Sequence, residues 1–146
     1  MFNPLAAVCA AQVAALLKRT DSVVELGNQT FAAPGAVPGT EHVKTTREFY
    51  LAIGFKDYLA IDLNTKMHAV AFDLNKSLRR DYNFTRTFDL VTNNGTGEHI
   101  FDQRAVFENM HDLCAVGGIM LHILPTQGWI NHGFFNFQPE IGRAHV

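Results

Sequence analysis

Polar side chains that suit ligand binding follow four apolar segments of the chain, at the point where each segment ends. Carboxylate and amide groups at such points can accept hydrogen bonds from the hydroxyls or amines of a small molecule. One such residue would indicate only a turn, because Asp and Asn are common in turns, and turn formation stays open as the alternative for all four. Four in succession favour a binding site. These residues are Glu25 and Gly27, then Asp62, then Asp73, and then Asn93, Asn94 and Gly95.

Glu98 and two histidines are candidates for proton transfer at a substrate. His99 follows Glu98 in the segment EHIFDQ, and His132 lies in the aromatic segment WINHGFFNF. Either imidazole can act as a general acid or base. Two structural alternatives stay open: an acid in the first turn of a helix, which favours the helix dipole, and an aromatic segment that packs in the core rather than lining a substrate pocket. The aromatic residues of that segment are Trp129, Phe134, Phe135 and Phe137.

The seven histidines do not predict a metal site. Four of them, between positions 99 and 132, show no ligand spacing typical of zinc proteins, and no cysteine pair joins them. The sequence therefore predicts packed or solvated histidines and no metal ligand. The four are His99, His111, His122 and His132.

The first of the polar loops, within SVVELGNQTF at residues 22–31, contains a single glycine, Gly27. Loops that bind dinucleotides need several glycines, because the pyrophosphate contacts backbone N–H groups at a helix start. The chain has neither the G-x-G-x-x-G pattern nor a phosphate loop with a lysine. A ligand without phosphates has less need of that cradle. S-adenosylmethionine is such a ligand, with a ribose diol, an adenine and an amino-acid tail.

Strands alternate with helices along the chain. Asn3 and Pro4 start the first helix, at 4–19, and Thr40 is expected to cap the second, which Gly54 ends. This alternation predicts an α/β fold: a Rossmann-like, doubly wound, mostly parallel sheet, truncated after about five strands. Ligands of such sheets bind beyond the carboxyl ends of the strands. The expected strands are 22–26, 57–62, 67–73, 88–92 and 119–124, a further helix spans 100–116, and the first helix carries its apolar spacing on Leu5, Val8, Cys9, Val13, Leu16 and Leu17.

The ordered set of segments resembles the class I S-adenosylmethionine-dependent methyltransferases of bacterial and environmental sequences. The resemblance covers residues 22–139, through VVELGNQTF, FYLAIGFKDYLAIDLN, AFDLN, FDLVTNNGTGEHIFDQ and GGIMLHILPTQGWINHGFFNFQP. It implies S-adenosylmethionine as the cofactor and methyl transfer to an unidentified acceptor. A small-molecule or glycan-type substrate fits this expectation.

The resemblance also implies a role for each polar residue. Glu25, Gly27 and Asn28 match the loop along the methionine portion of the cofactor. Asp62 matches the carboxylate that binds both ribose hydroxyls, with Leu63 beside it. Asp73 matches the residue at the adenine amino group, while Leu74 packs on the ring. Asn93, Asn94 and Gly95 match the strand end near the reacting methyl group, and His99 and His132 are the candidate acid or base residues.

The sequence departs from the family pattern at three points. Asn28 and Gln29 stand where further glycines are common, and an insert rich in proline and glycine lengthens the path from Glu25 to Asp62. The family sheet has seven strands, whereas five are visible, so an exposed sheet edge is expected. Two other functions stay open: a non-catalytic Rossmann-like binding or interaction domain, and a nicotinamide-dependent oxidoreductase, against which the missing glycines and the absence of a Tyr-x-x-x-Lys pair count.

Composition limits the number of domains, the classes of partner and the cellular location that are expected. The chain has 146 residues, of which 47% are hydrophobic, and this is enough for one domain. A net charge of −2 with scattered basic residues predicts no nucleic-acid partner. The apolar stretch 4–17 is too short to span a bilayer, so no membrane partner is expected. Two cysteines without a disulfide framework favour a cytoplasmic location. The oligomeric state stays open.

The last residues, IGRAHV at 141–146, match a translated sequencing adapter. The sequence AGATCGGAAGAGCACACGTC reads in its third frame as these residues, and its first two bases would complete a codon for Glu140. We therefore interpret residues 1–140 as an incomplete methyltransferase domain and 141–146 as adapter read-through, which is left out of fold reasoning. Sequencing the gene at its source tests this hypothesis.

Overall fold

The chain folds around one parallel sheet of five strands. The computed structural model describes residues 1–126, 128 and 130–138, so Trp129, Glu140 and the segment 141–146 lie outside the described residues. The strand order is β3-β2-β1-β4-β5, and every neighbouring pair is parallel. The strands are β1 (Ser22–Leu26), β2 (Asp57–Asp62), β3 (Val70–Ala71), β4 (Phe88–Asn94) and β5 (Cys114–Ile123).

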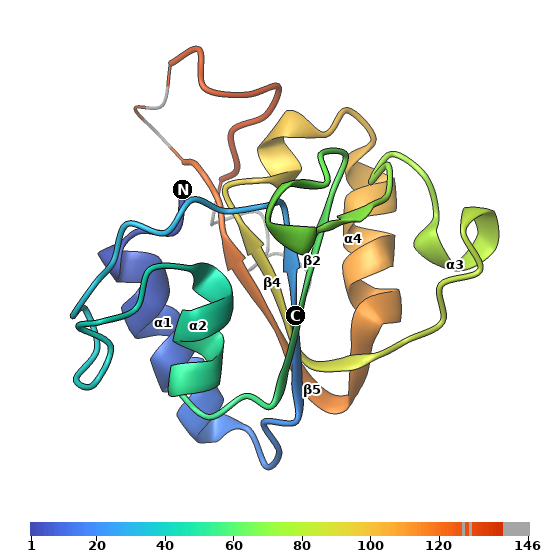
Figure 1. The fold of residues 1–146 in the computed structure, drawn as a ribbon. Coiled ribbons are helices and arrows are strands. Elements are labelled where there is room, and N and C mark those ends of the chain that lie inside the picture. The colour runs from blue at the N-terminus through green and yellow to red at the C-terminus, as the bar shows by residue number, and fades with distance from the viewer. Residues whose placement is uncertain (127, 129, 139–146) are drawn as a thin grey trace.

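Helices cover both faces of this sheet (Figure 1). α1 (Pro4–Leu16) and α2 (Thr46–Ala52) lie on one face, while α3 (Leu78–Asp81) and α4 (Gln103–Leu113) lie on the other. Two short 3-10 helices, η1 (Lys66–His68) and η2 (Gly97–His99), follow β2 and β4. The predicted Rossmann-like, doubly wound α/β fold is therefore confirmed.

The central strands are apolar on both sides because both faces are covered. Successive residues of a strand point to opposite faces, so Val23 packs toward α1 and α2 while Val24 packs toward α4. Both valines are fully buried. The sheet thus separates two hydrophobic cores, one rich in aromatic and alanine side chains and one rich in aliphatic side chains.

α1 begins as the sequence predicts but turns a different face inward. The Asn3 side chain accepts a hydrogen bond from the Ala6 N–H at 3.0 Å, and Pro4 occupies the first turn. The expected apolar stripe is wrong in part, since Leu5 and Leu16 are 61% and 77% exposed. Small side chains let the helix approach the sheet and the aromatic core closely. The buried residues of α1 are Ala6, Ala7, Ala10 and Ala14.

Several element boundaries differ from the prediction. α1 ends at Leu16, whereas the sequence predicts a helix that continues to residue 19. Thr45, not Thr40, caps α2, and the Thr40 hydroxyl instead donates to the Val37 carbonyl within the preceding loop. Of the segment 67–73, only Val70–Ala71 pairs as a strand. The helix expected over 100–116 spans only Gln103–Leu113, because β5 already begins at Cys114.

The strand order creates a crevice at one edge of the sheet. β1 lies between β2 and β4, so the chain leaves β1 toward one side and β4 toward the other. This is the topological switch point, where ligands of open parallel sheets bind. Among the described residues, no helix is both long and apolar enough to cross a bilayer.

Candidate functional site

A cavity of about 390 Å³ lies at the carboxyl ends of β1, β2 and β4. Its walls come from the loops that follow these strands, together with the chain start and the segment that follows β3. The sequence-predicted residues among them are Gly27, Asn28, Asp62, Leu63, Leu74, Gly95 and His99. The further lining residues are Met1, Gln29, Thr30, Ile61, Phe72, Thr96 and Ile100.

Gly27 is the position where the cavity loop turns. Its φ of +83° lies in the left-handed region that favours glycine. A Cβ atom at this position would lie 2.2 Å from the Thr96 hydroxyl oxygen. The Gly27 N–H donates to the Ile61 carbonyl at 2.8 Å, which ties the loop to the end of β2. The single glycine of this loop is therefore required by both its conformation and its neighbours.

Side-chain hydrogen bonds hold the loop where further glycines would otherwise be expected. The Gln29 amide donates to the Asn94 carbonyl at 2.9 Å and to the Thr96 hydroxyl oxygen at 3.0 Å. The Thr96 hydroxyl donates in turn to the Leu26 carbonyl at 2.8 Å. In the sequence, Gln29 stands out only as a departure from a glycine pattern, and nothing singles out Thr96. No local signal pairs these residues, because they meet only through the β1–β4 pairing.

The Asp62 carboxylate joins the loops after β1 and β2 and keeps hydrogen-bond acceptor sites for a ligand. One carboxylate oxygen accepts from the Asn28 N–H at 2.7 Å, and the other accepts from the Asn64 N–H at 3.0 Å. The Asn28 side chain donates to the Asn64 side-chain oxygen at 3.0 Å and to the Lys66 carbonyl. Each oxygen of a carboxylate has two acceptor sites, so Asp62 can accept two further hydrogen bonds from the cavity.

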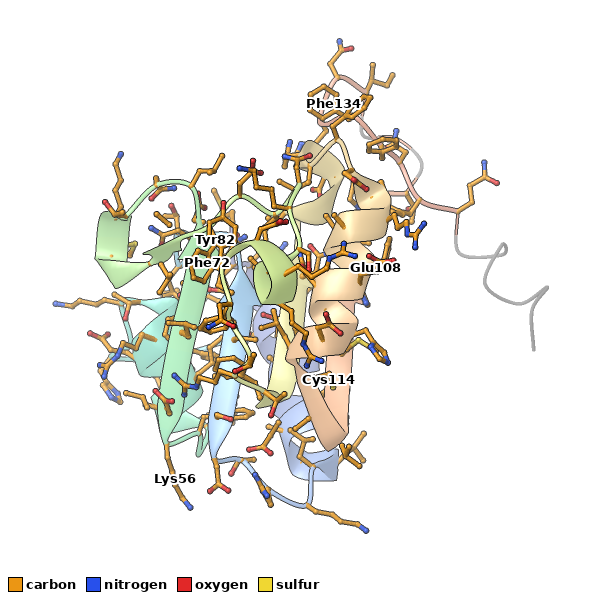
Figure 2. All side chains as sticks on the ribbon, turned by 90° about the vertical axis from the view of Figure 1, so that its right-hand side faces the viewer. Lys56, Phe72, Tyr82, Glu108, Cys114 and Phe134 are labelled. Carbon is orange, nitrogen blue, oxygen red and sulfur yellow. The ribbon has the colours of Figure 1, made fainter. Side chains whose placement is uncertain are left out.

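Apolar side chains form the wall beyond β2 and β3. Leu74 is buried and lines the cavity together with Phe72 and Ile100. Phe72 packs against Tyr82 with ring centroids 4.5 Å apart, and Figure 2 shows the two rings side by side. The Tyr82 hydroxyl oxygen accepts from the Asp73 N–H at 3.1 Å. This wall suits a flat, weakly polar group of a ligand.

Asp73 lies next to this wall but is not among the residues that line the cavity. One of its carboxylate oxygens accepts from the backbone and the side-chain N–H groups of Asn75, both at 2.9 Å. These hydrogen bonds lower the pKa of Asp73. The role of Asp73 at an adenine amino group stays a prediction.

Glu25 lies away from the cavity, among the residues between β1 and α2. It is fully buried, and the Tyr58 hydroxyl donates to one of its oxygens at 2.7 Å and lies 3.0 Å from the Thr46 hydroxyl oxygen. Burial raises the pKa of Glu25 to about 7, against the opposing effect of the Tyr58 and Thr46 hydroxyls. Burial also raises the pKa of Tyr58 above its usual range. The structure thus does not bring Glu25 together with the other predicted cofactor-binding residues.

Asn93 and Asn94 shape the loop after β4 rather than lining the cavity. The buried Asn93 side chain accepts from the Gly97 N–H at 2.8 Å and so starts η2. The Asn94 carbonyl holds Gln29, as described above. Gly95, with a φ of +62°, is the residue of this trio that lines the cavity.

Two predicted residues, His99 and His132, meet at Glu98. Glu98 and His99 are the last residues of η2, and His132 comes from the segment after β5. The Nε2 atoms of His99 and His132 lie 3.7 Å and 3.3 Å from the same Glu98 carboxylate oxygen. The two imidazole rings are 5.1 Å apart between centroids. His99 lines the cavity, so this group borders the candidate site.

Comparison of the chain with protein-family models, with curated proteins and with solved structures finds no match.

Proposed function

We propose that the chain binds S-adenosylmethionine and catalyses methyl transfer to a small-molecule acceptor. The observation that carries the proposal is the cavity at the switch point, lined by the Asp62 carboxylate and by the loop with a single glycine to which Asp62 is hydrogen-bonded. A carboxylate with two remaining acceptor sites suits a ribose diol. The Gly27 and Asn28 N–H groups donate to the Ile61 carbonyl and to the Asp62 carboxylate, so these two N–H groups are not available to a pyrophosphate.

Each wall of the cavity has a part in this proposal. Asp62 binds the ribose hydroxyls, and the apolar wall of Phe72, Leu74 and Ile100 packs on the adenine. The loop from Gly27 to Thr30 lies along the amino-acid tail of the cofactor. When bound, the cofactor supplies a methyl group activated by the sulfonium. The chain contributes by holding the acceptor in line with that group, which is catalysis by proximity and orientation.

His99 borders the cavity and is the candidate base at the acceptor. A base is needed only where the acceptor is a hydroxyl or a protonated amine. His132 lies next to the same Glu98 carboxylate as His99, so the two histidines can share one proton-transfer role. A small metabolite or a glycan is the proposed acceptor.

Calorimetric titration with S-adenosylhomocysteine tests the proposal, with NAD in a parallel cell. Saturable binding of the first ligand and none of the second is the expected result. Binding of NAD alone would contradict the proposal and favour an oxidoreductase. A cooperatively folded chain that binds neither ligand would favour a non-catalytic domain.

Substitution of Asp62 tests the ribose contact. Asp62→Ala should weaken S-adenosylhomocysteine binding by about 10- to 100-fold, since a charged hydrogen-bond partner is worth about 1.5–3 kcal/mol. Asp62→Asn keeps one carbonyl oxygen that can hold the Asn28 N–H and so separates loop collapse from loss of the ligand contact. Asp57→Asn is the matched control, because Asp57 begins the same strand at the opposite edge of the sheet. Equal affinity for S-adenosylhomocysteine in the wild type and the three variants would show that Asp62 does not contact the ligand.

A further inference from the structure

We infer that Glu98, His99 and His132 form a binding site for a divalent transition-metal ion of the Zn²⁺ class at the rim of the cavity. The three residues each offer one ligand atom, and these atoms lie within 4.8 Å of one another. The sequence spacing of the three residues does not indicate a metal site, because His132 follows β5 and is far from Glu98 and His99 in sequence. The inference concerns ion binding alone and does not depend on the identity of the organic cofactor.

Two of the three distances between the ligand atoms are close to those in a tetrahedral metal site. With metal–ligand bonds of about 2.0–2.2 Å, two ligands of a tetrahedral ion lie roughly 3.3–3.6 Å apart. The Nε2 atoms of His132 and His99 lie 3.3 Å and 3.7 Å from Glu98 Oε1. An ion therefore fits between the three side chains with small rotations of the imidazoles.

The Glu98 carboxylate is a second, independent observation that points to a cation. Its side chain is fully buried, yet among the described residues neither of its oxygens has a hydrogen-bond partner. Buried carboxylates are normally paired with hydrogen-bond donors or coordinate a metal, because an isolated buried charge is strongly unfavourable. A metal ion between Glu98 and the two imidazoles would supply the missing partner.

Backbone hydrogen bonds fix the segment after β5 against Glu98. The Glu98 carbonyl accepts from the Phe134 N–H at 2.8 Å and from the Phe135 N–H at 3.3 Å. A Cβ on Gly133 would lie 2.8 Å from the same carbonyl oxygen, so the approach is close. Figure 2 shows Phe134 at the end of the molecule opposite to Lys56, which places this segment at the carboxyl edge of the sheet. His132 is therefore held beside Glu98 by the fold.

The ligand set indicates which ion binds and what it can do. Two imidazoles and one carboxylate suit Zn²⁺, Fe²⁺ or Co²⁺, whereas Mg²⁺ and Ca²⁺ prefer oxygen ligands only. Three protein ligands leave at least one coordination position open, as in catalytic zinc sites. His99 belongs to both the cluster and the cavity, so the open position can take an oxygen donor of a molecule bound there.

Metal titration of the tag-free, chelator-treated chain tests the inference. Zn²⁺ in a calorimeter should bind at one site per chain, Co²⁺ should give visible absorption bands of a low-coordinate site, and Mg²⁺ should not bind. Zn²⁺ should also raise the thermal unfolding midpoint, since a ligand that binds only the folded state stabilises it. Failure of Zn²⁺ to bind saturably would overturn the inference.

Matched variants locate the ion. His99→Ala and His132→Ala should each weaken Zn²⁺ binding by at least about tenfold and remove the Co²⁺ bands. His111→Ala should leave both unchanged, because His111 is also an imidazole beside a carboxylate, 3.8 Å from Asp112, but lies on the surface of α4. Glu98→Gln keeps the buried shape and should weaken Zn²⁺ binding as well. Undiminished binding in the two histidine variants would overturn the inference by placing the ion elsewhere on the chain.

Discussion

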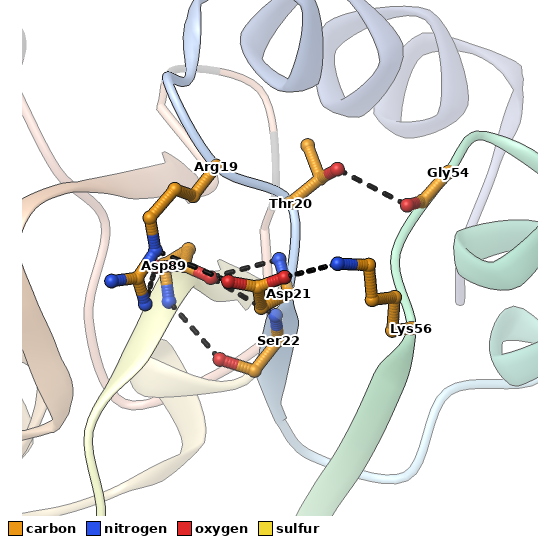
Figure 3. A network of polar contacts seen from close by, with 7 residues as sticks. All are labelled: Arg19, Thr20, Asp21, Ser22, Gly54, Lys56 and Asp89. Atoms are coloured by element: carbon orange, nitrogen blue, oxygen red, sulfur yellow. Dashed lines mark hydrogen bonds and ion pairs between the residues drawn. The ribbon is translucent and has the colours of Figure 1, made fainter.

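Carboxylates at the amino ends of the strands (the amino edge of the sheet) and carboxylates at the carboxyl ends (the carboxyl edge) differ in how many hydrogen-bond and ion-pair partners they have within the fold. At the amino edge, Asp89 is nearly buried and accepts hydrogen bonds from the Asp21 and Ser22 N–H groups at 2.9 Å and 3.1 Å (Figure 3). Its other oxygen pairs with Arg19 at 3.1 Å. Asp21 pairs with both Arg19 and Lys56 in the same network. Every carboxylate of this network therefore has partners within the fold.

At the carboxyl edge, the carboxylates keep binding capacity. Asp62 accepts one backbone N–H on each oxygen and faces the cavity, while Glu98 is buried without a hydrogen-bond donor among the described residues. Carboxylates thus stabilise the fold at the amino edge, whereas at the carboxyl edge they keep acceptor sites for a ligand. Buried polar groups are normally hydrogen-bonded, so the oxygens of Glu98, which lack a hydrogen-bond donor among the described residues, require an explanation.

The largest expected effect comes from removing the buried carboxylate of the amino edge. Asp89→Ala leaves the Asp21 and Ser22 N–H groups without their acceptor, which should lower the free energy of unfolding by about 3 kcal/mol. Urea unfolding measures this loss, and Asp89→Asn, which keeps one acceptor oxygen, should lose less. A loss below about 1 kcal/mol for Asp89→Ala would break the comparison between the edges.

Glu25 tests whether a buried carboxylate without a cation costs stability. Its pKa is about 7 in the folded chain against an ordinary 4.5, so the folded state binds this proton more tightly than the unfolded state. The contribution to stability is therefore complete below pH 4.5 and is lost as the pH rises through about 7, by about 3 kcal/mol in all. Glu25→Gln removes this titration.

Urea unfolding of both proteins at several pH values checks this prediction. The difference between the wild type and Glu25→Gln should change by about 3 kcal/mol between about pH 4 and about pH 8, with the wild type losing stability at high pH. Other titrating groups cancel in the difference. A difference that stays constant with pH would show that Glu25 keeps an ordinary pKa.

Gly27→Ala should have a smaller effect on stability but a clear effect on the carboxyl edge. The new Cβ would meet Thr96 and would also require a φ of +83°, so we expect a loss of about 1–3 kcal/mol and weaker binding of S-adenosylhomocysteine. Gly39→Ala is the control, since Gly39 has a φ of +86° with no atom within 4 Å. Equal losses of stability in the two variants would mean that the Thr96 side chain can move away from the new Cβ without destabilising the fold.

The smallest effect is expected at the exposed rim of the amino-edge network. Lys56 pairs with Asp21 at 2.6 Å, and this pair lowers the pKa of Asp21. The Lys56 side chain is 77% exposed, and exposed pairs are screened by solvent and contribute little. Lys56→Ala should leave the urea midpoint within experimental error of the wild type. A shift comparable to that of Asp89→Ala would mean that the exposed pairs, not Asp89, hold this edge.

Local sequence determined much of the architecture. The apolar segments 22–26 and 57–62 form β1 and β2 with the predicted bounds, because a short apolar run between polar turns suits a strand buried on both faces. Asn3 caps α1 as predicted, since its side chain needs only an N–H from the next turn. The α/β fold follows from the alternation of such elements.

Tertiary structure decided which polar residues meet. Strand alternation places Glu25 on the same face as Val23, toward α1 and α2, and only the packed helices show that this face lies away from the cavity. The contact of Gln29 with Thr96 depends on β1 and β4 being neighbours. The approach of His132 to Glu98 depends on the path of the chain after β5. Such contacts join residues far apart in sequence, so no local pattern encodes them.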